Sequence, residues 1–110
     1  MTPEGVLMRQ IQVAACAQGH RLLRNNVGAY FNDATGRWIR YGVGGPGGAD
    51  LIGWTRDGRF AAIEVKVGRR QPTAEQTTFI LAVQATGGRA GVARSVAEAL
   101  SILAQPGTTI

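Results

Sequence analysis

The apolar residues near the N-terminus recur at the spacing of an amphipathic helix. This stripe consists of Leu7, Met8, Ile11 and Ala15. Thr2 and Pro3 precede the stripe as a helix start and Gly19 follows it as a helix end, which predicts a helix over about residues 3–18. Glu4 then shares the face of the apolar stripe.

Short apolar segments separated by turn residues predict strands in the middle of the chain. HRLLRNNVGAYF and GRWIRYGV read as two short strands or extended segments around the turn NDATG. Residues 42–48 hold five glycines and predict a flexible loop. Residues 49–54 and 59–67 then predict two strands, joined by a tight turn at Asp57 and Gly58.

The last third of the chain predicts a helix, a strand and a helix. Pro72 and Thr73 open the second helix, and Gly87 with Gly88 ends it. Its stripe consists of Gln76, Phe79, Ile80 and Val83. Residues 89–94 predict a strand and residues 95–105 a closing helix. We therefore predict an α/β fold, with a mixed sheet of four or five strands and helices on both sides, in one domain over residues 1–110.

Two charged residues interrupt the most apolar of the predicted strands. Side chains alternate along a strand, so Glu64 and Lys66 point to one face and the apolar residues between them to the other. Asp50 begins the preceding strand, and antiparallel pairing through the tight turn would bring it toward Glu64 and Lys66. We therefore expect two carboxylates and one ammonium group to converge there.

Paired carboxylates at one end of a sheet suit a hard divalent cation. Mg²⁺ takes one or two carboxylates, often keeps several waters and accepts phosphate oxygens of a substrate. A neighbouring lysine can orient the attacking water and neutralise the charge that develops on the phosphate. The expected cofactor is Mg²⁺ or Mn²⁺.

The composition adds a preference for polyanions. The formal net charge is +5, the isoelectric point is near 10.7, and eleven of the twelve basic residues are arginine. Guanidinium groups pair with phosphate oxygens and stack on bases, which favours a nucleic-acid partner. An arginine-rich composition also follows from a high genomic G+C content, so charge alone leaves both explanations open. Lys66 is the only lysine, and its point charge is not interchangeable with a guanidinium group.

The single cysteine and the N-terminus limit the cellular setting. Cys16 excludes an internal disulfide and a multi-cysteine zinc site, and its position in an alanine-rich helical segment predicts a small buried side chain. The N-terminus lacks the pattern of an export signal, and no apolar segment approaches the length of a membrane span. We expect a soluble, cytoplasmic protein without a membrane partner.

The spacing Asp-x13-Glu-x-Lys formed by Asp50, Glu64 and Lys66 resembles the motif of the PD-(D/E)XK nuclease superfamily. More narrowly, the chain resembles the VRR-NUC family of small virus-type replication-repair nuclease modules, over nearly its whole length. The segments that carry this resemblance are the first helix with Glu4, RNNVG at 24–28, ADLIG at 49–53, IEVK at 63–66 and TAEQ at 73–76. The family's proline is replaced by Ala49, which removes a rigid residue but no ligand.

The resemblance implies a restriction-endonuclease-like core and a role for each motif residue. Asp50 and Glu64 would bind the metal ion together with the backbone carbonyl of Val65, and Lys66 would be the catalytic lysine. An ordinary exposed pair of cross-strand charges is the alternative interpretation of Glu64 and Lys66.

Two further residues are carried over to the catalytic set, each with a structural alternative. Gln76 would match the family's glutamine on the helix after the core strand, but it also completes a capping box with Thr73. Glu4 would match an acidic residue on the first helix, but it also suits the positive end of the helix dipole. The predicted DNA contacts are Arg24, Asn25, Asn26, Arg69 and Arg70.

Two other features carry weaker chemical interpretations. The glycine loop could hold a phosphate in a backbone nest, yet it lacks the ending of a P-loop and a helix directly after it. His20 is compatible with metal binding, although a histidine at a helix end commonly contacts the last carbonyls.

The predicted function is a Mg²⁺- or Mn²⁺-dependent endonuclease that hydrolyses DNA phosphodiester bonds, on branched DNA such as four-way junctions, in repair, recombination or phage replication. A homodimer is expected, since small free-standing members of the family act as dimers. The closing helix could contribute to the dimer interface or pack on its own sheet. A nuclease-derived module that binds DNA without cutting it is the main alternative, and an RNA-directed or protein-interaction role is a further one.

Overall fold

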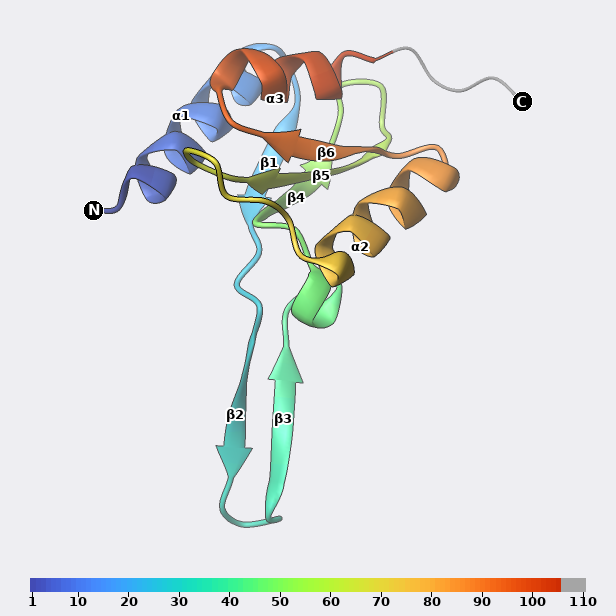
Figure 1. Ribbon diagram of the computed structural model, residues 1–110. Helices are drawn as coiled ribbons and strands as arrows, with labels where there is room; N and C mark the ends of the chain where they lie inside the picture. The colour runs from blue at the N-terminus through green and yellow to red at the C-terminus, as the bar shows by residue number, and fades with distance from the viewer. Residues whose placement is uncertain (106–110) are drawn as a thin grey trace.

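Helix α1 spans Pro3–Ala17 in the computed structural model, which describes residues 1–105 (Figure 1). Thr2 caps the helix, since its side chain accepts a hydrogen bond of 3.0 Å from the Gly5 N–H. The buried residues of α1 are Met8, Ile11 and Ala15, which confirms the predicted stripe. The prediction of a buried Cys16 is wrong: its side chain is exposed, because one step past Ala15 turns about 100° around the helix.

The main sheet has four strands in the order β1-β4-β5-β6. These strands are β1 (Arg21–Arg24), β4 (Leu51–Trp54), β5 (Phe60–Val65) and β6 (Arg89–Ala93). β1, β4 and β5 are antiparallel neighbours, whereas β6 runs parallel to β5. The mixed α/β sheet is therefore confirmed, with the turn before β5 closed by a 2.9 Å hydrogen bond from the Gly58 N–H to the Thr55 carbonyl.

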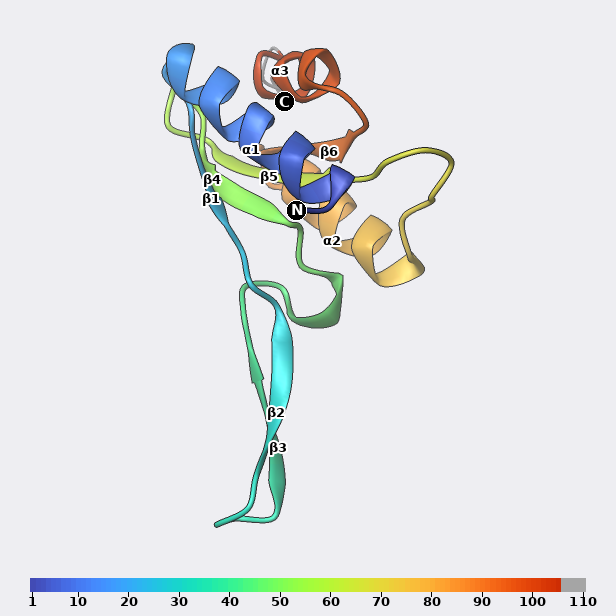
Figure 2. The same cartoon turned by 90° about the vertical axis from the view of Figure 1, so that its left-hand side faces the viewer.

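The first predicted strand proves to be two strands in two different sheets. β1 ends at Arg24, and β2 (Gly28–Asn32) pairs with β3 (Arg37–Tyr41) in a separate antiparallel hairpin. The chain leaves the main sheet at residue 25. We call residues 28–41 the arm, because this hairpin extends away from the rest of the molecule in both views (Figures 1 and 2).

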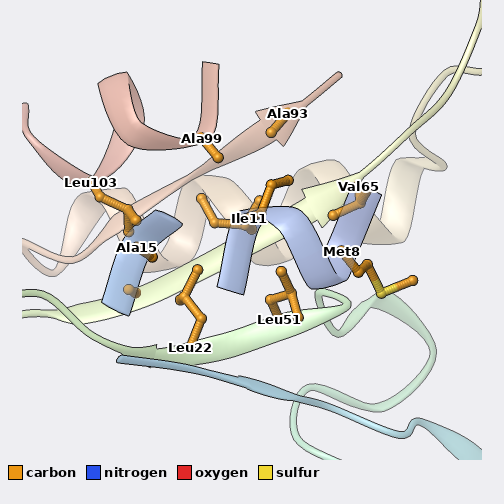
Figure 3. Close-up of a cluster of buried hydrophobic side chains, with 11 residues drawn as sticks. Met8, Ile11, Ala15, Leu22, Leu51, Val65, Ala93, Ala99 and Leu103 are labelled. Carbon is orange, nitrogen blue, oxygen red and sulfur yellow. The ribbon is translucent and has the colours of Figure 1, made fainter. Parts of the chain in front are cut away.

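Helices cover both faces of the main sheet (Figure 2). α1 and α3 (Val96–Leu103) pack on one face, and α2 (Ala74–Ala85) packs on the other. Figure 3 shows the larger core, in which Ile11, Leu51 and Leu103 meet between the helices and the sheet. β5 contributes side chains to both cores, because successive side chains point to opposite faces of the sheet. Ala61, Ile63 and Val65 face α1 and α3, while Ala62 faces α2.

The closing helix is used by this core. Ala99 and Leu103 are buried in it, and Val96 packs against it. Of the two uses predicted for the apolar face of the closing helix, packing on its own sheet is therefore the one observed.

The glycine loop contains a 3₁₀ turn, η1 (Gly45–Gly47), which lies against the first turn of α2. A Cβ atom on Gly47 would lie 2.4 Å from the carbonyl oxygen of Glu75, so only glycine permits this approach. Within residues 1–105, no helix is long and apolar enough to cross a membrane.

Candidate active site

The pairing of β4 with β5 brings the predicted metal ligands together. Leu51 lies opposite Ile63, so Asp50 reaches the end of β5 that carries Glu64. There the Val65 N–H donates a 2.9 Å hydrogen bond to Oδ2 of Asp50. On the other side, the Asn25 N–H donates a 2.8 Å hydrogen bond to the Asp50 carbonyl. Asp50 is thus held in place through both its backbone and its side chain.

Lys66 lies beside this pair of carboxylates. Its Nζ atom is 3.8 Å from Oε2 of Glu64, directly after the end of β5. Only 1% of Glu64 and 8% of Lys66 is exposed to solvent. The alternative of an ordinary exposed pair of cross-strand charges is therefore wrong, because both residues are buried between the sheet and its covering elements.

The surroundings of Glu64 disfavour its negative charge. Burial, and then the neighbouring Asp50 carboxylate, raise the pKa of Glu64 to about 8, although the Lys66 ammonium group opposes the shift. Oε1 of Glu64 is buried and has no hydrogen-bond partner among the described residues. A buried carboxylate oxygen without a partner is costly, and a cation bound between the two carboxylates would satisfy it.

The donor set fits a hard divalent cation. The described chain has no cluster of three or more His, Cys, Asp and Glu side chains that could hold a metal ion. Two carboxylates and a backbone carbonyl are nevertheless sufficient for Mg²⁺ or Mn²⁺, because such ions take their remaining ligands from waters and from substrate phosphate. Asp50, Glu64 and the Val65 carbonyl would supply the ligands from the protein.

A cleft of about 860 Å³ opens beside Asp50. The predicted site residues that line it are Glu4, Arg24, Asn25, Asn26, Asp50 and Gln76. The structure thus brings together side chains from α1, α2 and the segment after β1. Arg69 and Arg70 are exposed and follow β5 outside the cleft lining, where Arg70 lies 3.7 Å from Oε2 of Glu4.

The cleft is also lined by two residues that the sequence analysis missed. Arg40 and Tyr41 belong to β3, where they pair with Ala29 and Gly28 at the start of β2. The signal that could have found them is the hairpin itself. Antiparallel pairing across the NDATG turn brings the end of the second strand back beside the start of the first.

The side chain of Asn25 is engaged within the protein. Its Nδ2 atom donates hydrogen bonds to the carbonyls of Val43 (2.8 Å) and Ala49 (3.0 Å), and its Oδ1 atom accepts one from the Val43 N–H (2.9 Å). These bonds tie the base of the arm and the glycine loop to the entrance of β4. The predicted DNA contact at Asn25 stays a prediction, beside this observed structural role.

Gln76 and Glu4 keep their predicted structural roles as well. Oε1 of Gln76 accepts a hydrogen bond from the Thr73 N–H, and the Thr73 hydroxyl accepts one from the Gln76 N–H, so the capping box is present. Glu4 lies in the first turn of α1. Since both residues also line the cleft, their structural roles are compatible with contacts to a ligand there.

His20 lies outside the cleft. Its Nδ1 atom accepts a 3.0 Å hydrogen bond from the Arg56 N–H, beside the turn between β4 and β5. This turn lies at the opposite end of the two strands from Asp50 and Glu64. His20 therefore connects α1 to the distant end of the sheet.

Comparison with known proteins supplies one match. The family model of the VRR-NUC domain matches residues 8–97, a range that contains Asp50, Glu64, Lys66 and Gln76 and leaves Glu4 outside. Comparisons with curated proteins and with solved structures gave no match.

The raised pKa of Glu64 makes stability depend on pH when no metal ion is bound. The unfolded chain releases this proton near the ordinary value of 4.5, whereas the folded protein retains it up to about pH 8. Stability therefore falls as pH rises through this window, by up to about 1.4 kcal/mol per pH unit. In EDTA, the free energy of unfolding of wild type should fall by about 3 to 4 kcal/mol relative to that of Glu64→Gln between pH 5 and pH 8.

Urea unfolding followed by circular dichroism at several pH values measures this difference. Glu75→Gln, which removes an exposed carboxylate of α2, is the matched control and should follow wild type throughout. Parallel pH curves for wild type and Glu64→Gln would show that Glu64 titrates normally.

Proposed function

The chain belongs to the VRR-NUC family, whose domain is a nuclease of PD-(D/E)XK-type fold, and we propose that it is a Mg²⁺- or Mn²⁺-dependent endonuclease acting on branched DNA. The family implies a nuclease, DNA as its substrate and, in general, a divalent metal ion. The observation that carries the proposal for this chain is the half-buried Asp50 next to the buried Glu64. Oε1 of Glu64 has no hydrogen-bond partner among the described residues, and a cleft lined by Arg24 and Arg40 opens beside Asp50.

The cleft residues would position the substrate. Arg24 and Arg40 supply guanidinium groups that pair with phosphate oxygens, and Asn26 supplies an amide. The exposed Arg69 and Arg70 would contact phosphates farther along the backbone. Together these contacts would hold a phosphodiester against Asp50, at the buried end of β5.

The protein groups around the scissile phosphate have separate tasks. Asp50, Glu64 and the Val65 carbonyl would hold the divalent cation, which when bound supplies Lewis-acid activation of water and phosphate. The Lys66 ammonium group, 3.8 Å from Glu64, would orient the attacking water and neutralise charge that develops on the phosphate oxygens. Gln76 and Glu4 would orient ligands from the cleft wall.

The alternative of a module that binds DNA without cutting it gains no support from the site. A buried Glu64 carboxylate next to the half-buried carboxylate of Asp50 opposes folding, and binding of a polyanion does not require this pair. Metal-dependent chemistry would account for the presence of both carboxylates at the end of the core strand.

We include a homodimer in the proposal. The described chain has one candidate active site, and two such sites related by a two-fold axis would match the approximate symmetry of a four-way junction. Because the apolar face of α3 is buried in its own core, the interface would lie on another surface.

The first prediction concerns the metal ligands. Asp50→Asn and Glu64→Gln should each abolish cleavage of labelled DNA in Mg²⁺ or Mn²⁺, because each removes one of two carboxylate ligands. DNA affinity in EDTA should change by less than about threefold, because the phosphate contacts come from arginines elsewhere. Glu75→Gln is again the control, and cleavage at the wild-type rate by either site variant would contradict the ligand assignment.

The second prediction concerns the lysine. Lys66→Ala should slow the single-turnover rate about a hundredfold or more, with little change in the metal concentration that gives half the maximal rate. Lys66→Arg should restore little activity, since a planar guanidinium group does not replace a compact ammonium in a buried site. A single-turnover rate of Lys66→Ala within a few-fold of wild type, or full activity of Lys66→Arg, would exclude the catalytic role.

The third prediction concerns assembly and substrate. Light scattering at micromolar concentration should give twice the chain mass of 11.6 kDa, with and without junction DNA. In cleavage assays a four-way junction should be cut faster than a linear duplex of the same sequence. A monomer mass would exclude the homodimer, and equal cutting of both substrates would mean that the enzyme recognises the backbone and not the branch.

A further inference from the structure

The arm exposes large aromatic side chains on both of its faces. Residues paired across the two strands share a face, and successive residues alternate between faces. One face therefore carries Tyr30, Ile39 and Tyr41, and the other carries Phe31 and Trp38. The Phe31 and Trp38 rings pack edge to face, with their centroids 5.6 Å apart. The exposed fraction is 47% for Phe31 and 68% for Trp38.

This distribution is unusual for a hairpin that has no layer packed on it. An isolated two-stranded ribbon is only marginally stable in water. A ribbon that packs one face against a hydrophobic core is usually apolar on that face alone. The arm stands free of the body in Figures 1 and 2, and within residues 1–105 its strands pair only with each other. Its two apolar faces suit insertion between two elements of a partner.

The charge of the arm favours a nucleic acid over a second copy of this chain. The arm carries two positive charges, on Arg37 and Arg40 of β3, and one negative charge, on Asp33 in the turn. A nucleic acid offers phosphates to the two arginines and flat bases to the aromatic rings. Two arms packed against each other would instead bring arginines of like charge together.

The arm also leads directly into the candidate active site. The residues at its base, Gly28, Ala29, Arg40 and Tyr41, line the same cleft as Asp50. The base is fixed by two hydrogen bonds between the Asn25 side chain and the backbone of Val43, which lies just after β3. A strand bound along the arm would therefore continue toward Asp50.

We propose that the arm binds DNA at unpaired bases, with Phe31 and Trp38 stacking on bases exposed where a duplex opens and with Arg40, which shares their face, on the adjacent phosphates. This inference rests on the proposed function in that the cleft at the base of the arm is taken as the cutting site. It assigns the recognition of branched DNA to the arm and leaves the chemistry to the end of β5.

Fluorescence anisotropy in EDTA tests the arm without any cleavage. Wild type should bind a duplex with a short unpaired loop at least about tenfold more tightly than a fully paired duplex of equal length. The double variant Phe31→Leu and Trp38→Leu should lose this preference while its affinity for the paired duplex stays within about threefold. Leucine keeps an apolar side chain, so this loss would report stacking and not general apolar contact.

A matched control is available in the second tryptophan. Trp54 is 52% exposed and ends β4, at the opposite end of the strand from Asp50, so Trp54→Leu should keep the wild-type preference. In a Trp54→Phe background, the remaining Trp38 fluorescence should be quenched by the looped duplex and much less by the paired one. An unchanged preference in the double variant, or no preference in wild type, would overturn the proposal. A shift of the double variant from dimer to monomer would overturn it as well, because the arm would then be an interface between copies.

The same measurements separate this inference from the proposed function. Stacking that quenches Trp38, together with no cleavage of any DNA in Mg²⁺ or Mn²⁺, would refute the nuclease and support the arm. Cleavage that prefers branched DNA equally in wild type and in the double variant would support the nuclease and refute the arm.

Discussion

Two carboxylates held together at the end of the core strand, Glu64 buried and Asp50 half-buried, are the constraint on which the rest of this structure depends. β5 is covered by helices on both faces, so Glu64 is removed from water, and the Val65 N–H holds Asp50 next to it. Like charges in such a place repel strongly, and the Lys66 ammonium group compensates only in part. The arrangement is satisfied by a further cation, and for that reason it is better explained by function than by folding.

The glycine loop, the base of the arm and the start of α2 are all positioned around these two carboxylates. Asn25 is central to that arrangement, because its backbone N–H holds the Asp50 carbonyl while its side chain fixes the start of the glycine loop and the base of the arm. The close approach of Gly47 to α2 then brings the Gln76 turn to the wall of the cleft. Site geometry and arm direction are thus coupled through a few backbone hydrogen bonds, and a substrate held by both would be placed with little freedom.

The sequence was sufficient to predict the elements that follow strong local rules. Helix caps at Thr2 and Thr73 and the turn at Gly58 obey known residue preferences, and alternation along β5 predicted that Asp50, Glu64 and Lys66 converge. The departure of the arm from the main sheet could not be predicted, because it depends on side-chain hydrogen bonds from Asn25 to residues 18 and 24 positions away. The cleft position of Tyr41 likewise depends on how the base of the arm packs against the body. The exposure of Cys16 instead follows from helix periodicity, since Cys16 is one step past the buried Ala15.

The central claim is that Asp50 and Glu64 form a metal site, and a crystal structure with Mn²⁺ tests it most directly. Anomalous scattering should show one Mn²⁺ peak within metal–oxygen bonding distance of both carboxylates, with Oε1 of Glu64 as a ligand, and the peak should vanish in crystals of Glu64→Gln. Absence of a peak at this position in wild-type crystals at millimolar Mn²⁺, or persistence of the peak in the Glu64→Gln variant, would contradict the claim.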